Sequence, residues 1–402
     1  MSTRTILGRM PHRRLYAGFD IGRAVTIEDL RAMAYRRLPT FALEYLEGGA
    51  EEEATLIRNR EAFAELRFAP MALVDTSKRS AATTLFGTQI SMPIAIAPTG
   101  LNGLFWPKAD RTLAEAAAAI GVPFAQSTMS NDPIHEVAAV PGLRHWWQLY
   151  MFGAPDISRT LIERARGVGC EALVLTTDAQ IYGNREWDQR HHSAPRQLNW
   201  AAKVDAALHV RWLLSTIVAQ GMPSFANVVE FVPEGKRSLF DSAFWIRSQM
   251  NQALTWETIA HLRDLWPGKL LIKGLLRAED TLRAVEIGAD GVILSNHGGR
   301  QLDWTVAPLD VLPAVRQAVG DRIVILIDGG IRRGTDVIKA LALGADLVLV
   351  GRATLYGLAA AGKPGVEKAL EILCGEIERD LGLLGVSSVA ELGPHLCTRI
   401  QA

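Results

Sequence analysis

Residues 322–352, RIVILIDGGIRRGTDVIKALALGADLVLVGR, contain a complete strand, helix and strand unit. The residues between Arg322 and Asp328 are all aliphatic, which is typical of a buried parallel strand. Residues 335–346 place apolar side chains at helical spacing and end in Gly-Ala-Asp, and a second apolar run, 346–351, follows. This order predicts two parallel strands joined by a crossover helix.

The same alternation extends over most of the chain. Eight short apolar runs recur, and stretches of helical pattern lie between most of them. The runs are residues 92–99, 122–128, 144–150, 172–178, 269–274, 291–296, 322–328 and 346–351. Eight such units predict an α/β fold of the closed (β/α)₈ type, the TIM barrel. The alternative is an open doubly wound sheet, but that fold usually carries a GxGxxG turn after its first strand, and Ala97-PTGLNG does not fit it.

Two additions accompany the predicted barrel. Residues 25–75 show helical spacing after a capping Thr26, so an N-terminal helical segment is expected. Residues 190–255 form an insertion after the fourth strand that is far longer than an ordinary strand-to-helix connection. We therefore predict one barrel domain over residues 25–385, an N-terminal tail of residues 1–24 and a C-terminal tail of residues 386–402.

Within the insertion, apolar residues recur every four positions at Trp200, Val204, Leu208 and Trp212. This spacing forms one ridge of a helix. Such a helix either packs on the barrel or lies on a membrane or a partner as an amphipathic element. The pattern by itself favours packing on the barrel.

The composition argues against several classes of protein. The 402 residues are 49% hydrophobic and 21% charged, as in an ordinary globular protein. Lys plus Arg equal Asp plus Glu at 43 each, so the charge gives no indication of nucleic-acid binding. Three scattered cysteines argue against a disulfide framework and suit a reducing, cytoplasmic compartment. The basic N-terminus lacks the apolar core of a secretory signal, and no uncharged apolar run reaches about 18 residues, so no transmembrane helix is expected.

Polar or charged side chains follow all eight apolar runs, at the end of a barrel where active sites are built. These residues are Thr99, Ser127, Gln148, Tyr150, Thr176, Asp178, Lys273, Ser295, His297, Arg300, Asp328, Gly351 and Arg352. The need for a soluble surface alone hardly explains why so many polar side chains occur at these ends. The last two ends, Asp328-GGIRRG and Gly351-Arg352, predict a phosphate site, because glycines permit close backbone approach and arginine adds bidentate contacts.

A base and an orienting carboxylate are candidates for catalysis at this mouth. Asp178 can orient the ring of His297 and stabilise its protonated form. Lys273 follows an apolar run, so its ammonium group needs a buried partner. His135-Glu136 lacks the second His of an HExxH motif, and no Cys/His cluster occurs, so no metal site is predicted.

Two arginines and two phenols complete the candidate site. Arg300 and Arg185 can bind one carboxylate between them, and Tyr45 and Tyr150 can add hydroxyl donors. Together with the base, these groups predict proton removal from a small carboxylic acid.

From about residue 26 to about residue 385 the chain resembles the family of FMN-dependent 2-hydroxy acid dehydrogenases and oxidases. The most specific motif is Ser295-NHGGRQLD. Further matches are Glu44-YLEGGAEEE, Pro93-IAIAPTG, Gln148-LY, Thr176-TD, Ile272-KG, Asp328-GGIRRGTDV and Val350-GR. Within the family it most resembles the (S)-mandelate dehydrogenases, through Pro98-TGLNGLFWPK, Leu262-RDLWPGKLLIKGLLRAED and Gly351-RATLYGLAAAG.

The resemblance implies that FMN lies across the barrel mouth. Its phosphate would contact Gly330, Arg332, Gly351 and Arg352. Asp328 and Ser295 would hold the ribityl chain, and Lys273 would lie near the N1–O2 edge of the flavin. The ring would be lined by Pro98, Thr99, Gly100, Ser127, Gln148 and Thr176.

The resemblance also implies the roles of the substrate site. The residues in contact with substrate would be Tyr45, Gly100, Met129, Tyr150, Tyr182, Arg185 and Arg300. His297, supported by Asp178, would be the base. It would take a proton either from the α-carbon or from the hydroxyl group, in the second case with hydride transfer to FMN.

An aromatic 2-hydroxy acid such as (S)-mandelate is the expected substrate, although Tyr182 can narrow the pocket. Gly100 stands where oxidases of the family usually carry Ala, which favours a dehydrogenase with a quinone-type electron acceptor. The alternative is an oxidase that reduces oxygen to hydrogen peroxide. A non-catalytic flavin-binding protein, or a colourless isomerase or lyase acting on a phosphorylated substrate, are more distant alternatives.

The resemblance finally implies a homotetramer and a way to reach a membrane. Mandelate dehydrogenase carries a membrane-attachment segment at the position of the 190–255 insertion. This makes attachment of the Trp200–Trp212 ridge to a membrane as well supported as packing on the barrel. The expected location is the cytoplasm, with peripheral contact to the inner face of the cell membrane.

Overall fold

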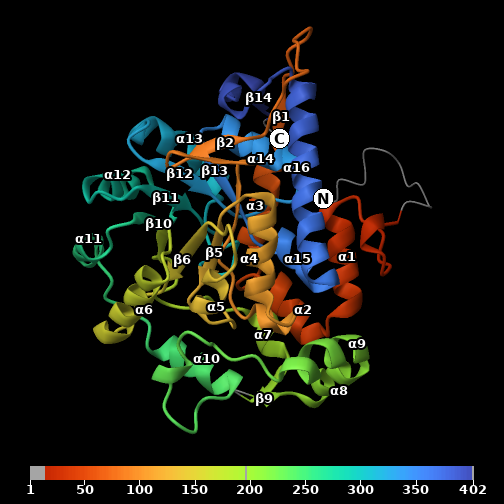
Figure 1. Cartoon of the computed structure of the whole chain (residues 1–402), viewed down its shortest axis with the longest axis vertical. Helices are drawn as coiled ribbons and strands as arrows, with labels where there is room; N and C mark the ends of the chain where they lie inside the picture. Colours follow the sequence, from red (N-terminus) through yellow and green to blue (C-terminus); the bar gives the residue numbers. More distant parts are fainter. Residues whose placement is uncertain (1–13, 195–196, 401–402) are drawn as a thin grey trace.

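Eight short parallel strands close into a barrel in the described part of the chain (Figure 1). The computed structural model describes residues 14–194 and 197–400. The barrel strands are β4 (Ile94–Ile96), β5 (Phe124–Ser127), β6 (His145–Leu149), β7 (Ala172–Thr176), β10 (Lys269–Leu275), β11 (Gly291–Leu294), β12 (Val324–Ile327) and β13 (Leu347–Val350). The ring closes where Val348 of β13 lies opposite Ile94 of β4. Each apolar run contains one strand, and the prediction of a (β/α)₈ barrel is confirmed.

The strands are buried on both faces, which explains why they read as continuous apolar runs. Their inward side chains fill the barrel with residues that include Ala95, Trp146, Leu271 and Leu326. A hairpin of β2 (Thr83–Leu85) and β3 (Thr88–Ile90) carries Phe86, whose ring centroid lies 6.5 Å from that of Trp146. The barrel interior is therefore a packed core, and chemistry is left to its mouth.

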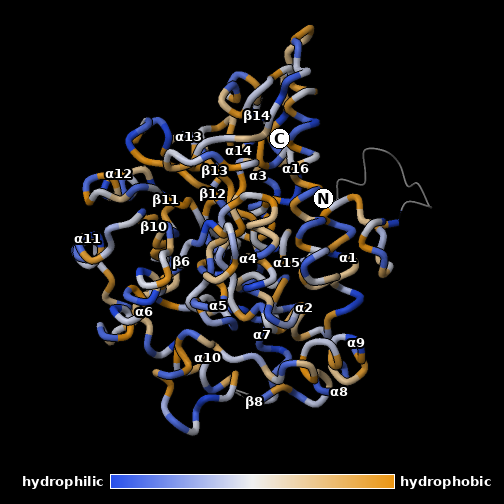
Figure 2. Tube along the Cα trace, in the orientation of Figure 1, coloured by the Kyte–Doolittle hydropathy of each residue, from blue (hydrophilic) through white to orange (hydrophobic). Residues whose placement is uncertain are grey.

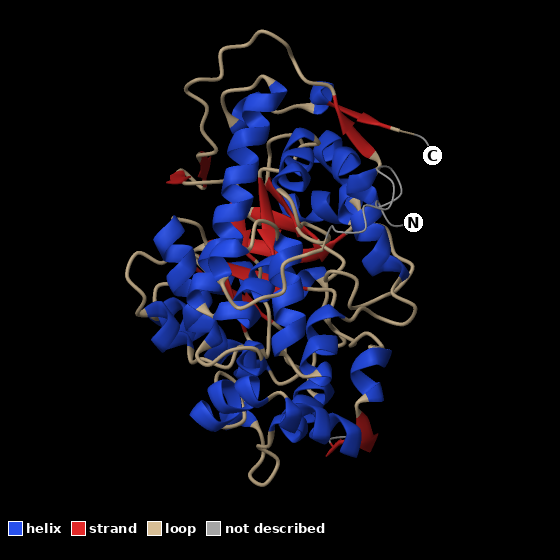
Figure 3. Cartoon of the chain, turned by 90° about the vertical axis from the view of Figure 1, so that its right-hand side faces the viewer, coloured by secondary structure: helices blue, strands red, loops and turns tan. Residues whose placement is uncertain are grey.

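Helices surround the strands, as Figure 3 shows. They are α4 (Ala109–Ile120), α5 (Ile134–Ala138), α6 (Pro155–Gly167), α11 (Trp256–Leu265), α12 (Ala278–Glu286), α13 (Pro308–Val319), α14 (Gly334–Ala342), α15 (Arg352–Ala361) and α16 (Lys363–Leu384). The helix predicted between β12 and β13 is α14. The predicted stop of α4 is also confirmed, since Gly121 caps it in the left-handed conformation with φ of 81°.

The N-terminal segment is helical over most of the predicted range. Thr26 and Asp29 form a capping box at the start of α1 (Ile27–Arg37), which α2 (Thr40–Glu47) and α3 (Ala54–Ala64) follow. The prediction is wrong after α3, because β1 (Leu66–Phe68) pairs in antiparallel fashion with β14 (Cys397–Arg399). The region expected to be a C-terminal tail is thereby tied to the N-terminal segment. Residues 1–13 of the expected N-terminal tail lie outside the described residues. The rest of that tail contains a short 3-10 turn, η2 (Ile21–Arg23).

The insertion folds into several short elements at the lower end of Figure 1. They are α7 (Glu186–Arg190), β8 (His192–Ala194), β9 (Gln197–Leu198), α8 (Trp200–Leu208), α9 (Val210–Trp212), the π-helical η4 (Leu213–Val218), the 3-10 turn η5 (Val229–Phe231) and α10 (Leu239–Ser248). The first of these elements, α7, begins at Glu186, slightly before the predicted start of the insertion at residue 190. These elements cover the C-terminal ends of the strands, because residues of α10 line the cavity described below.

The predicted ridge is only partly buried. Trp212 is 2% exposed and donates a hydrogen bond of 2.7 Å from Nε1 to the carbonyl oxygen of Leu104. Trp200, Val204 and Leu208 are 78%, 42% and 75% exposed. The helix is interrupted at His209, so the four residues do not share one face. Packing on the barrel is therefore confirmed for Trp212 and wrong for the other three.

Candidate active site

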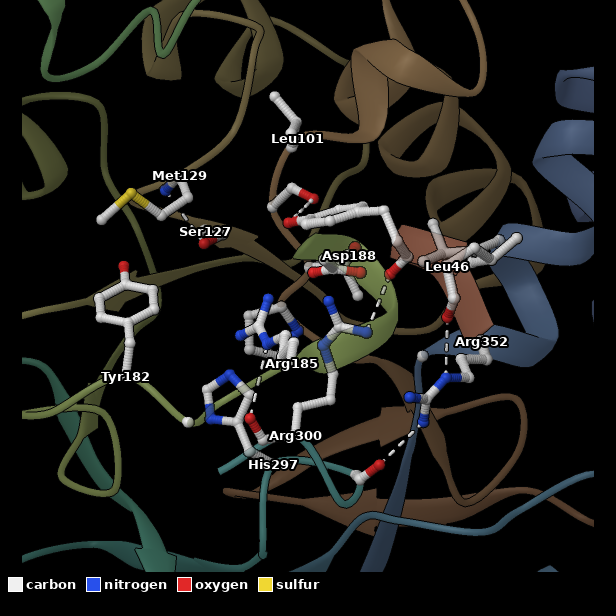
Figure 4. A pocket seen from close by; sticks show the side chains of 18 of the residues that line it. Leu46, Leu101, Ser127, Met129, Tyr182, Arg185, Asp188, His297, Arg300 and Arg352 are labelled. Atoms are coloured by element: carbon white, nitrogen blue, oxygen red, sulfur yellow. Dashed lines mark hydrogen bonds between the residues drawn. The ribbon is translucent and has the colours of Figure 1, made fainter. Parts of the chain in front are cut away.

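A cavity of about 800 Å³ lies at the C-terminal ends of the barrel strands (Figure 4). It collects most of the residues predicted from the sequence: Tyr45, Pro98, Thr99, Gly100, Ser127, Met129, Gln148, Tyr150, Thr176, Tyr182, Arg185, Lys273, His297, Arg300, Asp328, Gly330, Arg332, Gly351 and Arg352. Asp178 and Ser295 are absent from its lining. Both lie behind the wall, in contact with residues that do line the cavity.

His297 stands on a turn that is strained for a residue with a side chain. Its φ is 59°, and Gly298 and Gly299 follow with φ of 66° and 79°. At Gly299 an added Cβ would lie 2.7 Å from the backbone of Leu56, so only glycine fits there. The turn directs the ring into the cavity, where its Nε2 lies 3.4 Å from the hydroxyl oxygen of Tyr150. Strain of this kind is commonly retained at functional sites.

Asp178 fixes the protonation state of this histidine. Its Oδ1 lies 3.0 Å from Nδ1 of His297, so the Nδ1–H donates to the carboxylate and leaves Nε2 free to accept a proton. Burial lowers the pKa of His297 below its ordinary value, although Asp178 partly offsets this effect. Burial opposes the charge of Asp178 too, but His297 and Lys273 lower the pKa of that carboxyl overall. At neutral pH the pair is a neutral imidazole beside a carboxylate, which is a base ready for use.

Lys273 joins the His297 turn to the strand end at Asp328. Its Nζ donates to Oγ of Ser295 over 2.8 Å and lies 3.3 Å from Oδ2 of Asp328. Burial disfavours the ammonium ion, but Asp328 and Asp178 more than offset this and raise the pKa of Lys273. The Ser295 hydroxyl, fully buried, also accepts the backbone N–H of His297 over 3.0 Å. Ser295 therefore holds Lys273 and His297 in place, and its contact with the ribityl chain of FMN stays a prediction.

Two guanidinium groups occupy one side of the cavity. Arg300 donates from Nη1 to the carbonyl oxygens of Tyr45 and Gly48 over 2.9 and 2.7 Å, and Nε of Arg185 lies 3.5 Å from the carbonyl oxygen of Arg300. Burial, followed by the charge of Arg185, lowers the pKa of Arg300 to about 9. Among the described residues neither arginine forms an ion pair within 4 Å. Buried cations in this state are stabilised by an anion, and a carboxylate matches their geometry.

Asp188 is a cavity residue that the sequence reasoning missed. Its Oδ1 is buried without a hydrogen bond to any described residue, and its charge favours the charged form of Arg300. It lies on α7, three residues after Arg185, which the sequence predicted to bind the substrate carboxylate. Helical spacing from Arg185 was therefore the signal that could have found Asp188. Residues of α10 also line the cavity, among them Phe240 and Arg247. The sequence gives no comparable signal for them, because only the folded insertion brings them to the barrel mouth.

A ladder of hydrogen bonds crosses the wall formed by β5, β6 and β7. Ser127 Oγ donates to Gln148 Oε1 over 2.8 Å, and Gln148 Nε2 donates to Thr176 Oγ1 over 3.0 Å. On the adjacent loop, Asn102 Nδ2 donates to Oγ1 of Thr99 over 3.0 Å. These fixed polar groups can bind the edge of a planar heterocycle.

The ends of β12 and β13 offer groups for a phosphorylated, hydroxylated ligand. Asp328 Oδ1 is buried without a hydrogen-bond partner among the described residues, so it can accept a ligand hydroxyl. Gly330 packs so closely on α3 that an added Cβ would lie 2.2 Å from the carbonyl oxygen of Asn59. The N-terminus of α15 and the guanidinium of Arg332 favour an anion beside it. These residues fit the ribityl chain and phosphate of FMN.

Arg352 lines the cavity and also donates hydrogen bonds to four backbone carbonyl groups. It donates from Nε to the carbonyl oxygen of Leu46 and from Nη1 to that of Gly298, both over 2.9 Å. Its Nη2 reaches the carbonyl oxygens of Glu47 and Gly48 over 3.2 and 3.0 Å. Most of its donors are thus used in clamping α2 to the catalytic turn. Its charge lies at the cavity, so its contact with the phosphate of FMN stays a prediction.

Comparison with known proteins places this site in a family. A family model described as FMN-dependent dehydrogenase matches residues 34–399. (S)-Mandelate dehydrogenase of Pseudomonas putida is 46% identical over 370 residues, 92% of each chain. L-Lactate dehydrogenase of Caulobacter vibrioides is 41% identical over 367 residues, 90% of this chain and 95% of the relative.

A solved structure shares the fold as well as the sequence. The crystal structure of monotopic membrane protein (S)-mandelate dehydrogenase superposes with a TM-score of 0.89 at 44% identity, covering 94% of this chain and all of the other. The agreement covers the closed barrel of eight parallel strands. The chain belongs to the family of FMN-dependent 2-hydroxy acid dehydrogenases.

Proposed function

We propose that this enzyme oxidises an aromatic 2-hydroxy acid such as (S)-mandelate to the corresponding 2-oxo acid. The observation that carries the proposal is one cavity in which two partly buried arginines accompany a histidine base held by Asp178. The aromatic class is supported by the mandelate dehydrogenase relative and by apolar lining residues such as Phe225 and Leu239. The lactate dehydrogenase relatives are only slightly less similar, so lactate is the competing substrate.

The protein's own groups divide the work of the reaction. FMN, when bound, supplies the acceptor for the two electrons that leave the substrate. Arg300 and Arg185 bind the carboxylate and orient the acid, and the Tyr150 hydroxyl contacts the substrate hydroxyl. His297 takes a proton at Nε2, and Asp178 stabilises the imidazolium that forms.

Lys273 contributes a fixed positive charge to the same mouth. It is buried, held by Ser295 and paired with Asp328, so it needs no reorganisation when negative charge develops nearby. Charge stabilisation in a buried site is stronger than in water because the surroundings screen it less. We assign Lys273 the stabilisation of negative charge on the cofactor side of the cavity.

The electron acceptor proposed for the second half of the reaction is a quinone. At Gly100 an added Cβ would lie 2.7 Å from Cβ of Met129, so the Ala usual in oxidases of the family would require Met129 to move. This departure supports a dehydrogenase. Aerobic turnover with mandelate should release little hydrogen peroxide compared with the amount of 2-oxo acid formed. Stoichiometric peroxide would instead support the alternative, an oxygen-using oxidase.

We also propose that the insertion attaches the enzyme to the surface of a membrane. In addition to Trp200, Val204 and Leu208, the following turns expose Leu214 and Val218 at 56% and 67%, and Figure 2 marks this region as rich in hydrophobic residues. Exposed basic residues, among them Lys203 and Arg211, flank the apolar ones. A surface of this kind suits the interface of an anionic membrane. No helix in residues 14–194 or 197–400 is long and apolar enough to span a membrane.

Replacing Val204 and Leu208 together by Asp should weaken binding to vesicles of phosphatidylglycerol and phosphatidylcholine by at least about tenfold. Each substitution removes apolar area and adds a charge that the interface and the anionic lipid disfavour. Sedimentation of the holoenzyme with vesicles measures the bound fraction. The matched control is Leu383→Asp on α16, where the side chain is 69% exposed. Equal binding by both variants, or no binding by the parent enzyme, contradicts the membrane proposal.

Within the same proposal, the enzyme is a homotetramer in the cytoplasm. Three side chains after the catalytic turn, Leu302, Trp304 and Val306, are 75%, 75% and 48% exposed. Such an apolar patch suits an interface between subunits. Light scattering by the holoenzyme gives the number of chains directly.

A further inference from the structure

Tyr182 brings a hydroxyl group into the substrate cavity that the reaction does not use. It lies on the loop after β7 and lines the cavity. Within the described residues it forms a ring contact but no hydrogen bond through its hydroxyl. Burial raises the pKa of Tyr182 to about 12, so the group remains a hydrogen-bond donor at neutral pH. Because Tyr182 is only partly buried, its hydroxyl can bind water in the free enzyme and a ligand oxygen in its place.

The position of Tyr182 relates it to the far end of a substrate. Figure 4 shows Tyr182 and Met129 on one side of His297, with Arg185 and Arg300 on the other, and the Tyr182 hydroxyl directed toward Met129. A 2-hydroxy acid whose carboxylate is bound by the arginines places its reacting carbon near His297. Its side chain then extends toward Tyr182 and Met129.

Arg247 adds a second polar group at the same end. It comes from α10 of the insertion and lines the cavity, and its guanidinium carbon lies 4.8 Å from the centre of the Tyr182 ring. This stacking is its only polar contact with the described residues. The residues around it on α10, Phe240, Ala243 and Ile246, are apolar and also line the cavity. Tyr182 is partly buried and Arg247 is exposed to solvent, and both line the cavity with donors that no described residue accepts from.

We propose that Tyr182 and Arg247 form a subsite that selects 2-hydroxy acids whose aromatic ring carries a hydroxyl group at its far end. This rests on the proposed oxidation of aromatic 2-hydroxy acids and names the substrate class more closely. The ring packs against Met129 and the apolar residues of α10, and the phenolic oxygen accepts a hydrogen bond from Tyr182. A substrate without that oxygen leaves the donors unpaired, and sites of this kind discriminate against such analogues.

The test compares (S)-4-hydroxymandelate with (S)-mandelate as reductants of the FMN holoenzyme without oxygen. The parent enzyme should show a specificity ratio of roughly 10 in favour of the hydroxylated acid, the size expected of one hydrogen bond. Tyr182→Phe should bring the ratio close to one, and Arg247→Leu should lower it by a smaller factor. Met129→Leu, an apolar replacement in the same wall, should affect both acids by the same factor and leave the ratio unchanged.

The outcomes separate this inference from the function on which it rests. If mandelate reduces the flavin and the parent ratio is near one, the subsite is overturned while the proposed function stands. A ratio that survives in Tyr182→Phe overturns it equally. If neither acid reduces the flavin, the proposed function itself fails. Retention of the bound-flavin absorbance by each variant shows that it has folded.

Discussion

Replacing His297 by Ala should lower the rate of flavin reduction by the 2-hydroxy acid by about 10³- to 10⁴-fold while FMN stays bound. A positioned general base can raise a rate by up to about 10⁴-fold. No other described group near Tyr150 is a neutral base held by a carboxylate, so none can replace His297. Rapid mixing of oxidised holoenzyme with substrate in the absence of oxygen measures the rate directly.

The chain offers a matched control for this variant in His145. It is also a buried histidine, but it lies at the start of β6, where its Nε2 is 3.0 Å from Oε1 of Gln126. Burial lowers the pKa of His145 to about 4, so it too is neutral. His145→Gln should leave the reduction rate within about twofold of the parent. A near-normal rate in His297→Ala would mean that another group removes the proton.

The second large effect is expected at Arg300. Arg300→Met should lower kcat/KM for the 2-hydroxy acid by about 10²- to 10³-fold, because the buried carboxylate loses its charge-assisted partner and Arg185 alone remains. Arg300→Lys should recover part of the loss, since an ammonium restores charge but not the planar pair of donors. Steady-state kinetics with a dye acceptor gives both values.

The comparison variant for Arg300 is Arg111→Met. Arg111 lies on α4 and pairs with Glu115 at the molecular surface, an arrangement that contributes little to stability. It should therefore behave like the parent enzyme. If Arg300→Met kept the parent kcat/KM, the substrate carboxylate would have to be bound elsewhere in the cavity.

Much of the fold could be predicted because the barrel strands are buried on both faces. Burial makes each strand a continuous apolar run, and the change to polar residues at its end marks the mouth of the barrel. His297, Lys273 and Arg300 were found in this way, since each follows such a run within a few residues. The sequence also predicted that the buried ammonium of Lys273 needs a partner, and the structure shows that this partner is Asp328.

The insertion could not be predicted to the same degree. A four-residue apolar spacing indicates a helix face but not what covers it, so Trp212 and Leu208 gave the same signal although one is buried and the other exposed. Arg247 reaches the cavity only after the insertion has folded over the strand ends. No local pattern encodes such an approach, because contacts between distant segments depend on the packing of the whole.

The hydrogen-bond partners of individual polar groups at the mouth were also beyond the sequence. Arg352 follows a strand as a phosphate ligand would, yet its donors are largely used by the carbonyl groups of residues 46–48 and 298. Ser295 lies behind the wall and bridges Lys273 and His297. In both cases buried groups need hydrogen-bond partners, and only the folded chain shows which partners they have.

Anaerobic spectroscopy of the purified holoenzyme tests the central claim most directly. We expect a yellow protein whose flavin absorbance is bleached within seconds by (S)-mandelate or its ring-hydroxylated form, and far more slowly by (S)-lactate or glycolate. Bleaching by lactate at an equal or higher rate would contradict the aromatic substrate class. A yellow protein that no 2-hydroxy acid bleaches would contradict the catalytic roles assigned to His297 and the two arginines.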